Sequence, residues 1–498
     1  MCNNFTKLFI TCFLLGVINL SWGQDKTGNS SPAPEKPNVL IFLVDDMGLM
    51  DTSVPFLTGE NGQPKEYPFN RYYKTPGMEK LAERGIRFET FYANSVCSPS
   101  RVSLMTGQSS ARHGTTTWIN PIKKNEGPAE WCWEGLNSKN VTLPRILQSN
   151  GYRTIHVGKA HFGPVGSQGE EPTNLGFDVN VAGSSIGRPA DYSGLNNYGT
   201  GLRHVQDLEI YHGTDTHLSD ALTLEMCRKI DNAVEDKKPF FAYMAHYAVH
   251  SPFQPDPRFA GQYHDDLGDK MPAFASLIAG MDKSLGDLLG HLESIDQAEN
   301  TLVIFMGDNG SDAPVNKHQH DIVSSAPIRG KKGAHYEGGM RVPFIVAWAK
   351  VNPENKFQKQ FQIAQNAITT KAFATIEDIM PTVLELTGAN IPDNHKMDGK
   401  SILPALKAAD TPTGRKHFLM HFPHQHRSNN FTVYREGNWK IIRHYNNQGE
   451  SAFELFNLEN DLTESNNLAK SDSKKLEEMK KTMQAELDNA GALFMGKN

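Results

Sequence analysis

The sequence predicts an α/β fold, in which a large, mostly parallel sheet is sandwiched by helices and followed by a smaller C-terminal α+β subdomain. Short, nearly continuous apolar runs alternate with helix-like segments, as in doubly wound sheets whose strands are buried on both faces. Beyond about Arg415, strand-like pieces come close together and precede a charged helix. The length of 498 residues also exceeds the usual size of a single hydrophobic core.

Four apolar runs are predicted to be strands, and polar residues follow each of them. The runs and the residues that follow are Val39–Val44 with Asp45 and Asp46, Thr154–Val157 with Lys159 and His161, Phe240–Tyr247 with His250, and Leu302–Met306 with Asp308 and Asn309. Open α/β sheets bind ligands at the carboxyl ends of their strands. We therefore expect the four polar clusters to converge in one crevice, although each cluster alone would also fit an ordinary turn.

Candidate helices lie between these strands and after them. They are Met78–Arg84, Leu143–Ser149, Leu218–Ala233, Pro272–Ser294 and Thr375–Thr387, the last with Gly388 as a stop signal. In the C-terminal part, Trp439–His444 and Phe453–Phe456 are predicted strands, and Ser473–Ala490 is a predicted helix. These patterns divide the folded chain into a main domain, residues 38–414, and a C-terminal subdomain, residues 415–498.

The first residues indicate an exported protein. Lys7 precedes the apolar run Leu8–Leu20, and Ser21-Trp22-Gly23 supplies the small residues of a signal-peptide cleavage site. The run is shorter than the roughly 20 apolar residues that cross a bilayer. We therefore expect a signal peptide over residues 1–23, a flexible linker over residues 24–37, and a periplasmic or secreted protein without a membrane span.

Charge and cysteine count narrow the function further. A formal net charge of −6 gives no basic field for a polyanion, which argues against nucleic acid as a partner. Loss of the signal peptide leaves Cys97, Cys132 and Cys227, an odd number in an oxidising compartment. Cys132 and Cys227 could pair or could both be thiols. Cys97 needs another explanation.

The segment Cys97-Ser98-Pro99-Ser100-Arg101, followed by Leu104-Met105-Thr106-Gly107, resembles the signature of type I sulfatases in the alkaline phosphatase superfamily. Further segments resemble this family, and its bacterial carbohydrate sulfatases, in the same order: Asp45-Asp46, Gly158-Lys159-x-His161, His250-Ser251-Pro252-Phe253, Gly307-Asp308-Asn309-Gly310, and Gly330-Lys331-Lys332-Gly333 leading into Tyr336-Glu337-Gly338-Gly339-x-Arg341-Val342-Pro343. The resemblance covers nearly the whole mature chain.

The resemblance implies a sulfuric ester hydrolase with a large mixed sheet in its catalytic domain and a four-stranded antiparallel sheet plus a helix in its C-terminal subdomain. It also implies that a maturation enzyme oxidises Cys97 to formylglycine. Chemistry agrees, because one hydroxyl of an aldehyde hydrate can attack sulfur and deprotonation of the other can then expel sulfate. Pro99 suits the first turn of a helix whose free N–H groups would face an anion beside Cys97.

Two sets of polar residues match the remaining needs of this reaction. Asp45, Asp46, Asp308 and Asn309 would form a hard-cation site that the modified Cys97 completes; calcium is expected, and magnesium remains possible. Fixed positive charge from Arg101, Lys159 and Lys332 would stabilise the transition state. His250, alone or with Lys332, is the candidate general acid, His161 the candidate base of the second step, and Asp308 a candidate acceptor of the first proton.

Export favours an extracellular sulfated carbohydrate as substrate, such as a galactose or galactosamine unit. Candidate substrate contacts are Arg203, His204, His318, His424 and Arg427, with weaker candidates in His320, His421, His426, Trp118, Trp131 and Trp133. Two alternatives remain open from the sequence. One is a phosphate or phosphonate monoester hydrolase on the same scaffold, and the other is an inactive protein that binds sulfated glycans.

Overall fold

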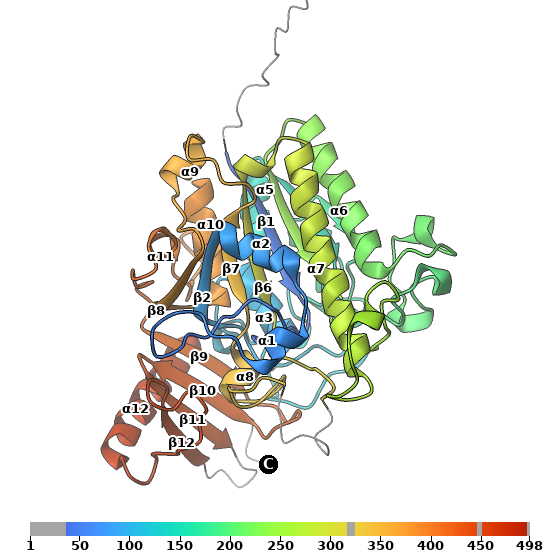
Figure 1. Cartoon of the computed structure of the whole chain (residues 1–498). Coiled ribbons are helices and arrows are strands. Elements are labelled where there is room, and N and C mark those ends of the chain that lie inside the picture. The colour runs from blue at the N-terminus through green and yellow to red at the C-terminus, as the bar shows by residue number, and fades with distance from the viewer. Residues whose placement is uncertain (1–35, 316–323, 446–450, 496–498) are drawn as a thin grey trace, which may run out of the picture. The chain divides into compact units, whose positions relative to one another are not determined.

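The computed structural model describes residues 36–315, 324–445 and 451–495 (Figure 1). The expected signal peptide, almost all of the expected linker, and the candidates His318 and His320 lie outside these residues. Among the helices within them, none combines the length and apolar character needed to cross a bilayer.

The main sheet has eight strands in the order β4-β3-β5-β1-β6-β7-β2-β8. β7 is antiparallel to both β6 and β2, whereas the other neighbouring strands are parallel. The sheet is therefore mixed and mostly parallel, as predicted. The strand bounds are β1 Asn38–Val44, β2 Gly85–Tyr92, β3 Arg153–Gly158, β4 Val179–Val181, β5 Phe240–Ala245, β6 Thr301–Gly307, β7 Phe344–Trp348 and β8 Ala367–Thr375.

Helices cover both faces of this sheet, and its central strands β1, β5 and β6 are mostly apolar and buried at every position. In β1, Leu40 and Phe42 belong to one core cluster, whereas Val39 and Ile41 belong to the other. The first cluster includes residues of α2 (Pro76–Arg84), α6 (Leu218–Glu235) and α7 (Met271–Ser294). The second includes residues of α3 (Cys97–Thr106), α5 (Leu143–Ser149) and α10 (Ile379–Thr387). Figure 1 shows α6 and α7 side by side along one face.

The predicted helices are present, with one change. The segment expected as a single helix from Thr375 to Thr387 begins as the last residue of β8, continues as a 3-10 turn over Ile376–Asp378, and becomes α10 only at Ile379. Gly388 ends α10 in the left-handed conformation, with φ of 67°, as a stop signal requires. Short helices connect the larger elements: α1 Pro68–Tyr72, α4 Ser110–His113, α8 Glu337–Met340, α9 Lys356–Gln360 and α11 Leu403–Lys407.

The C-terminal part forms a separate antiparallel sheet of four strands, in the order β12-β11-β10-β9. One face packs against α12 through Tyr434, Ile441 and Met483. The other face packs against Tyr92 and Met340 of the main domain. The four strands and the helix confirm the expected α+β unit; the bounds are β9 His417–Phe422, β10 Phe431–Glu436, β11 Trp439–Tyr445, β12 Ser451–Asn457 and α12 Ser473–Ala490.

A buried ion-pair network also joins the C-terminal sheet to the main domain. Lys440 on β11 places its Nζ 3.0 Å from Oε1 of Glu337, the first residue of α8, and 2.6 Å from Oε1 of Glu464. All three side chains are buried. Breaking such a pair by removing one partner costs about 3–5 kcal/mol, because it leaves a buried charge uncompensated.

Candidate active site

The four polar clusters expected to converge do so because β3, β5, β1 and β6 are consecutive neighbours and run in the same direction. Val44 pairs with Gly307, so Asp45 and Asp308 leave the same edge of the sheet side by side. Asp46 and His161 adopt left-handed backbone conformations, with φ of 61° and 55°. Such conformations are uncommon for residues other than glycine and concentrate at functional sites.

Three buried carboxylates form the centre of the site. Asp45, Asp46 and Asp308 each offer an oxygen within 4.8 Å of the others. The Asp46 backbone N–H donates to Asp308 Oδ1 at 3.1 Å, and Asn309 Nδ2 donates to Asp46 Oδ1 at 2.9 Å. Asp45 Oδ1 and Asn309 Oδ1 are buried with no hydrogen-bond partner. An oxygen-only donor set with two unused buried oxygens fits a hard divalent cation such as calcium.

Each carboxylate also has a buried cationic partner. Lys159 Nζ lies 2.7 Å from Asp45 Oδ2, and Lys332 Nζ lies 2.7 Å from Asp46 Oδ2. Arg101 donates from Nε and Nη2 to Asp308 Oδ2 at 3.0 and 2.9 Å. Positive and negative side chains therefore balance, so a bound divalent cation would leave a net positive charge that favours the anion of a sulfate ester.

Burial and these partners set the charge states. Burial raises the pKa of Asp45 well above its usual value, although Lys159 acts in the opposite direction. Burial alone would lower the pKa of Lys332, but Asp46 and the other negative groups nearby together outweigh burial, and the pKa is raised. Lys332 therefore stays protonated, whereas Asp45 is a buried carboxylate that further positive charge would stabilise.

Cys97 is the first residue of α3 and is only 3% exposed. The helix begins two residues before the expected start at Pro99, which still lies in its first turn. The residue before Cys97 makes no side-chain cap, so the backbone N–H groups of the first turn have no side-chain acceptor there. Arg101 follows four residues later and shares the helix face of Cys97.

His161 is oriented as a base toward position 97. Its Nε2 lies 2.7 Å from the carbonyl oxygen of Ile119, and its Nδ1 lies 3.3 Å from Cys97 Sγ. A carbonyl oxygen only accepts, so Nε2 carries the proton and Nδ1 presents a lone pair in the neutral imidazole. Burial lowers the pKa of His161 well below its usual value, which keeps the ring neutral.

His250 lies on the other side of the carboxylates. Its Nε2 is 3.5 Å from Asp46 Oδ2, and its Nδ1 is 3.0 Å from the carbonyl oxygen of Ser251. Burial lowers the pKa of His250 well below its usual value despite the adjacent Asp46. Of the two candidate acids, Lys332 is therefore the one that its surroundings keep protonated.

Comparison with known proteins agrees with this geometry. The family model described as Sulfatase matches residues 37–389, and the model described as N-sulphoglucosamine sulphohydrolase, C-terminal, matches residues 331–492. The chain belongs to the sulfatase family. This sulfatase is therefore a sulfuric ester hydrolase of the alkaline phosphatase superfamily, as the resemblance implied.

Individual relatives extend over most of this sulfatase. A protein named Sulfatase from Formosa agariphila is 27% identical over 93% of this chain and 89% of its own. N-acetylgalactosamine-6-sulfatase from Mus musculus is 28% identical over 75% of this chain and 67% of its own. The crystal structure of Ps i-CgsB in complex with k-i-k-neocarrahexaose has a TM-score of 0.70 and 24% identity, covering 91% of this chain and 93% of that chain. The last likeness confirms the fold.

The residues expected to contact substrate differ in their distance from the site and in their availability to a ligand. Arg427 lies near the site, because its Nη2 is 2.9 Å from Asp312 Oδ2 and its side chain lies against Gly333, next to Lys332. His424 is buried with Nε2 2.6 Å from Thr116 Oγ1 and Nδ1 2.7 Å from Glu126 O, so neither nitrogen is available to a ligand. Arg203 is exposed, and Nδ1 of His204 lies 3.0 Å from Gly199 O.

The weaker candidates are mostly engaged within the protein. His421 is buried, with Nδ1 2.7 Å from Thr432 Oγ1 and Nε2 2.7 Å from Leu493 O. Trp131 packs against the ring of His424 at 4.7 Å, and Trp118 lies 5.9 Å from the ring of His426. These contacts give the aromatic residues structural partners within the protein.

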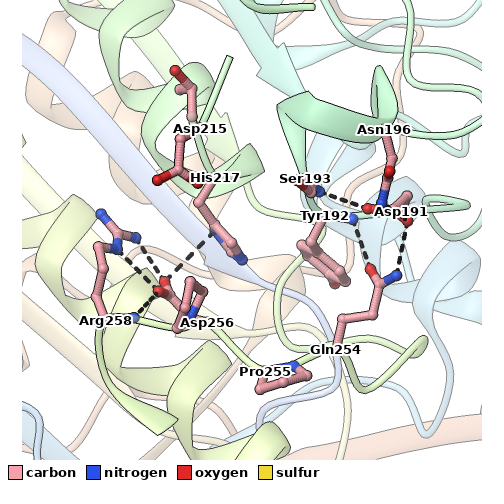
Figure 2. Close-up of a pocket in the computed structure, with 12 residues that line it drawn as sticks. Asp191, Tyr192, Ser193, Asn196, Asp215, His217, Gln254, Pro255, Asp256 and Arg258 are labelled. Atoms are coloured by element: carbon pink, nitrogen blue, oxygen red, sulfur yellow. Dashed lines mark hydrogen bonds and ion pairs between the residues drawn. The ribbon is translucent and has the colours of Figure 1, made fainter. Parts of the chain in front are cut away.

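Sequence reasoning missed a cavity of about 180 Å³ (Figure 2). Its wall includes Tyr192, whose hydroxyl donates to the backbone oxygens of Tyr247 and His250 at 2.8 and 2.7 Å. His217 stacks on Tyr192 and keeps its Nε2 buried without a hydrogen-bond partner. The lining comes from residues 191–217 and 254–258, which carry no motif, so only the folded contacts reveal it.

The two remaining cysteines of the expected mature chain do not pair. Cys132 and Cys227 are both free and half-buried. Burial raises the pKa of each thiol, to about 12 for Cys227. Neither thiol therefore has the low pKa of a reactive cysteine.

Proposed function

We propose that this sulfatase is exported and removes sulfate from an extracellular carbohydrate, such as a galactose or galactosamine unit, with calcium and a formylglycine derived from Cys97. The observation that carries the proposal is the neutral His161, whose Nδ1 lies 3.3 Å from Cys97 Sγ beside three buried cations. The expected export signal and the relationship to an N-acetylgalactosamine-6-sulfatase support a carbohydrate substrate.

Formylglycine at position 97 would supply, as its hydrate, a nucleophilic hydroxyl and a second hydroxyl whose deprotonation expels sulfate. The residues around it would handle charge and protons. His161 Nδ1 faces position 97 and would accept a proton there. Asp308 would accept the other proton, and its Oδ2 is held in place by Arg101.

Arg101, Lys159 and Lys332 would stabilise the negative charge that builds up on the sulfate oxygens. All three are buried, so their charges act where water screens little. Their carboxylate partners fix them before substrate arrives, and little reorganisation is needed during the reaction.

The leaving alkoxide of a sugar needs a proton, because it is far more basic than a phenolate. Lys332 is the favoured donor, since Asp46 keeps it protonated. His250 would then orient the leaving oxygen or relay the proton, and its Nε2 faces the same Asp46 carboxylate.

Asp45, Asp46, Asp308 and Asn309 would hold the calcium ion. The ion would supply a divalent charge that binds sulfate oxygens and lowers the cost of burying three carboxylates. Magnesium suits the site less, because it prefers to retain several waters and the unused oxygens here are buried.

Export and maturation complete the proposal. The signal peptide would deliver the chain to the periplasm or outside the cell, and a formylglycine-generating enzyme of the host would act on Cys97. Residues 38–414 would form the catalytic domain and residues 415–498 the C-terminal subdomain, which would contribute Arg427 to the mouth of the site.

The decisive experiment is peptide mass spectrometry of the protein from its native host, together with sulfate release from sulfated galactose and galactosamine. A peptide containing residue 97 that is lighter by about 18 Da, with sulfate release, is expected from conversion of the thiol to an aldehyde. An unmodified thiol in a protein active on phosphate esters would favour the phosphatase alternative. An unmodified, inactive protein that still binds sulfated glycans would favour the binding alternative.

The variant Cys97→Ala is expected to abolish sulfate release while leaving the fold and much of the calcium binding intact. Circular dichroism and calorimetric calcium titration provide the controls. Sulfate release by this variant at the rate of the unchanged enzyme would contradict the mechanism.

A further inference from the structure

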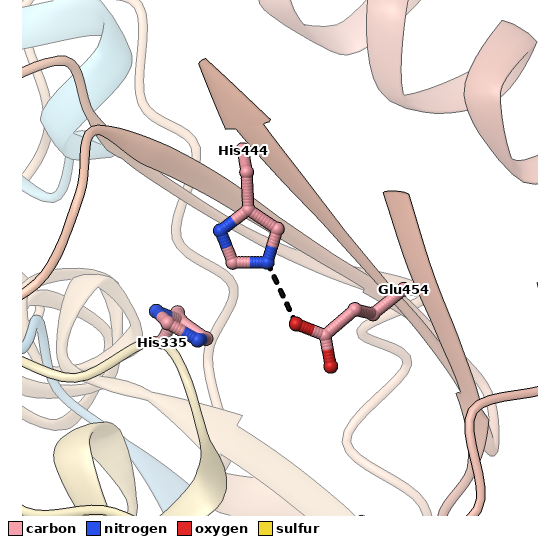
Figure 3. A group of neighbouring side chains, drawn as sticks. All are labelled: His335, His444 and Glu454. Atoms are coloured by element: carbon pink, nitrogen blue, oxygen red, sulfur yellow. Dashed lines mark hydrogen bonds and ion pairs between the residues drawn. The ribbon is translucent and has the colours of Figure 1, made fainter. Parts of the chain in front are cut away.

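A second group of side chains with the geometry of a metal site lies outside the active site. His335 precedes α8, His444 lies on β11 and Glu454 lies on β12 (Figure 3). Each offers one donor atom, and the three atoms lie within 4.8 Å of one another. We propose that these two imidazoles and this carboxylate bind one Zn²⁺ ion, with water at the fourth position.

The C-terminal sheet fixes two of the three ligands. Glu454 pairs with Ile442 across β11 and β12, so His444 is its diagonal neighbour on the same face. His444 Nε2 lies 2.8 Å from Glu454 Oε1. The ring of His335 meets the ring of His444 edge to face, with centroids 4.6 Å apart and an angle of 86° between planes. The third ligand therefore comes from a loop of the main domain.

The surrounding structure orients the three proposed ligands but does not satisfy all of their hydrogen-bonding atoms. His335 Nδ1 is buried and has no hydrogen-bond partner. The Tyr336 hydroxyl donates to Glu454 Oε1 at 3.1 Å, as groups behind a metal ligand commonly do to orient it. His444 and Glu454 side chains remain 18% and 21% exposed, so an ion and a water can reach the group.

The donor types favour zinc. Two imidazole nitrogens and one carboxylate oxygen form a tetrahedral Zn²⁺ site when water takes the fourth position. The carboxylates at the ends of β1 and β6 are an oxygen-only set that suits a hard cation. The two groups differ in hardness and should therefore select different metals from a mixture.

A bound zinc ion would connect parts of the chain that matter to the active site. His335 is three residues from Lys332, whose Nζ holds Asp46. Zinc would tie the loop that carries Lys332 to β11 and β12. We therefore expect zinc to raise the melting temperature of the full-length protein, in addition to any effect of calcium.

The test is a zinc titration of the full-length protein in the presence of excess Ca²⁺, which occupies the hard site. The host chain carries Cys97→Ser, so that no thiol at position 97 competes for zinc. The variants are His335→Ala and His444→Gln, and the matched control is His264→Ala, which removes an exposed histidine far along the chain from the group. Calorimetry gives affinity, elemental analysis gives stoichiometry, and the visible spectrum of the Co²⁺ form reports tetrahedral coordination.

We expect one zinc ion per chain in the host protein and in the control, and at least about tenfold weaker binding in each of the other two variants. The rise in melting temperature should be lost with the binding. Equal zinc affinity in all four proteins, or no zinc bound in the presence of calcium, would overturn the proposal. If His335→Ala fails to fold, His444→Gln decides, because glutamine can keep the hydrogen bond to Glu454 while removing the imidazole ligand.

Discussion

Lys331 and Lys332 are neighbours in the chain but occupy different environments. Lys332 is 6% exposed and donates to Asp46, whereas Lys331 is half-buried. We predict that Lys332→Met lowers kcat/KM for sulfate release by about 10²–10³-fold, the usual effect of removing one stabilising group from a transition state. Lys331→Met is the matched control, and its kcat/KM should stay within a few-fold of the unchanged enzyme. Steady-state kinetics of both variants measures the difference. Equal losses in the two variants would contradict the assignment of Lys332.

Asp45 leads to a prediction about pH. Burial raises the pKa of its carboxyl well above the usual value near 3.8, so the calcium-free folded chain binds a proton there more tightly than the unfolded chain does. Lowering the pH therefore stabilises the calcium-free form through this group, and protons compete with calcium. Calorimetric titration between about pH 8 and pH 5 should show calcium affinity falling as the pH is lowered. A calcium affinity that is constant over this range would contradict the raised pKa.

How much of the site was predictable depends on the kind of contact. The residues at the ends of β1, β3, β5 and β6 were predicted, because parallel strands place whatever follows them at one edge. The neutral tautomer of His161 was not, because it follows from a hydrogen bond to Ile119, which is distant in sequence. The engagement of His424 by Thr116 and Glu126 is likewise a contact between distant segments that no local pattern reports.

At the scale of elements, α2 begins without a cap of its own and relies on α7. Asp282 accepts the N–H groups of Gly77 and Met78 at 2.7 and 2.8 Å, which satisfies two backbone donors at the start of α2. We predict that Asp282→Ala lowers the free energy of unfolding by about 1–2 kcal/mol, the cost of losing a helix cap. Urea denaturation measures the change. Asp287→Ala, which removes an exposed carboxylate from the same helix, should leave the urea midpoint nearly unchanged.

The bounds of helices and strands were predicted best where a local sequence pattern alone determines them. The start and end of α5 and α12 match the sequence signals, since apolar spacing and stop signals act within a few residues. The direction of β7 could not be predicted, because an apolar run has the same pattern in a parallel strand and in an antiparallel strand. Only its pairing with β6 and β2 shows that β7 is antiparallel. The split of Thr375–Thr387 into strand, turn and helix also depends on pairing, here between β2 and β8.

At the scale of the whole molecule, the contacts between the two sheets make separate unfolding unfavourable. Lys440 pairs with Glu337 and Glu464 in the interior, and Tyr92 packs on Phe418 with rings 4.6 Å apart. We predict that residues 36–498 unfold in one calorimetric transition. Lys440→Met should lower the melting temperature of this transition without splitting it into two transitions. Lys416→Met, at an exposed position near β9, is the control. Two separate transitions in the unchanged protein would contradict this prediction.

The burial of Cys97 also limits when an enzyme can reach its side chain. With 3% of its surface exposed, the side chain is closed to any large catalyst once the fold is complete. Lys332 lies close enough to interact electrostatically with Cys97, and it leaves the ribosome roughly 235 residues later, on the order of 10–50 s at ordinary rates of synthesis. The proposed oxidation of Cys97 would therefore have to happen while the chain is still being made or held unfolded. Export and maturation would then compete against the speed of folding, and a host that folds this chain quickly would accumulate well-folded but inactive protein.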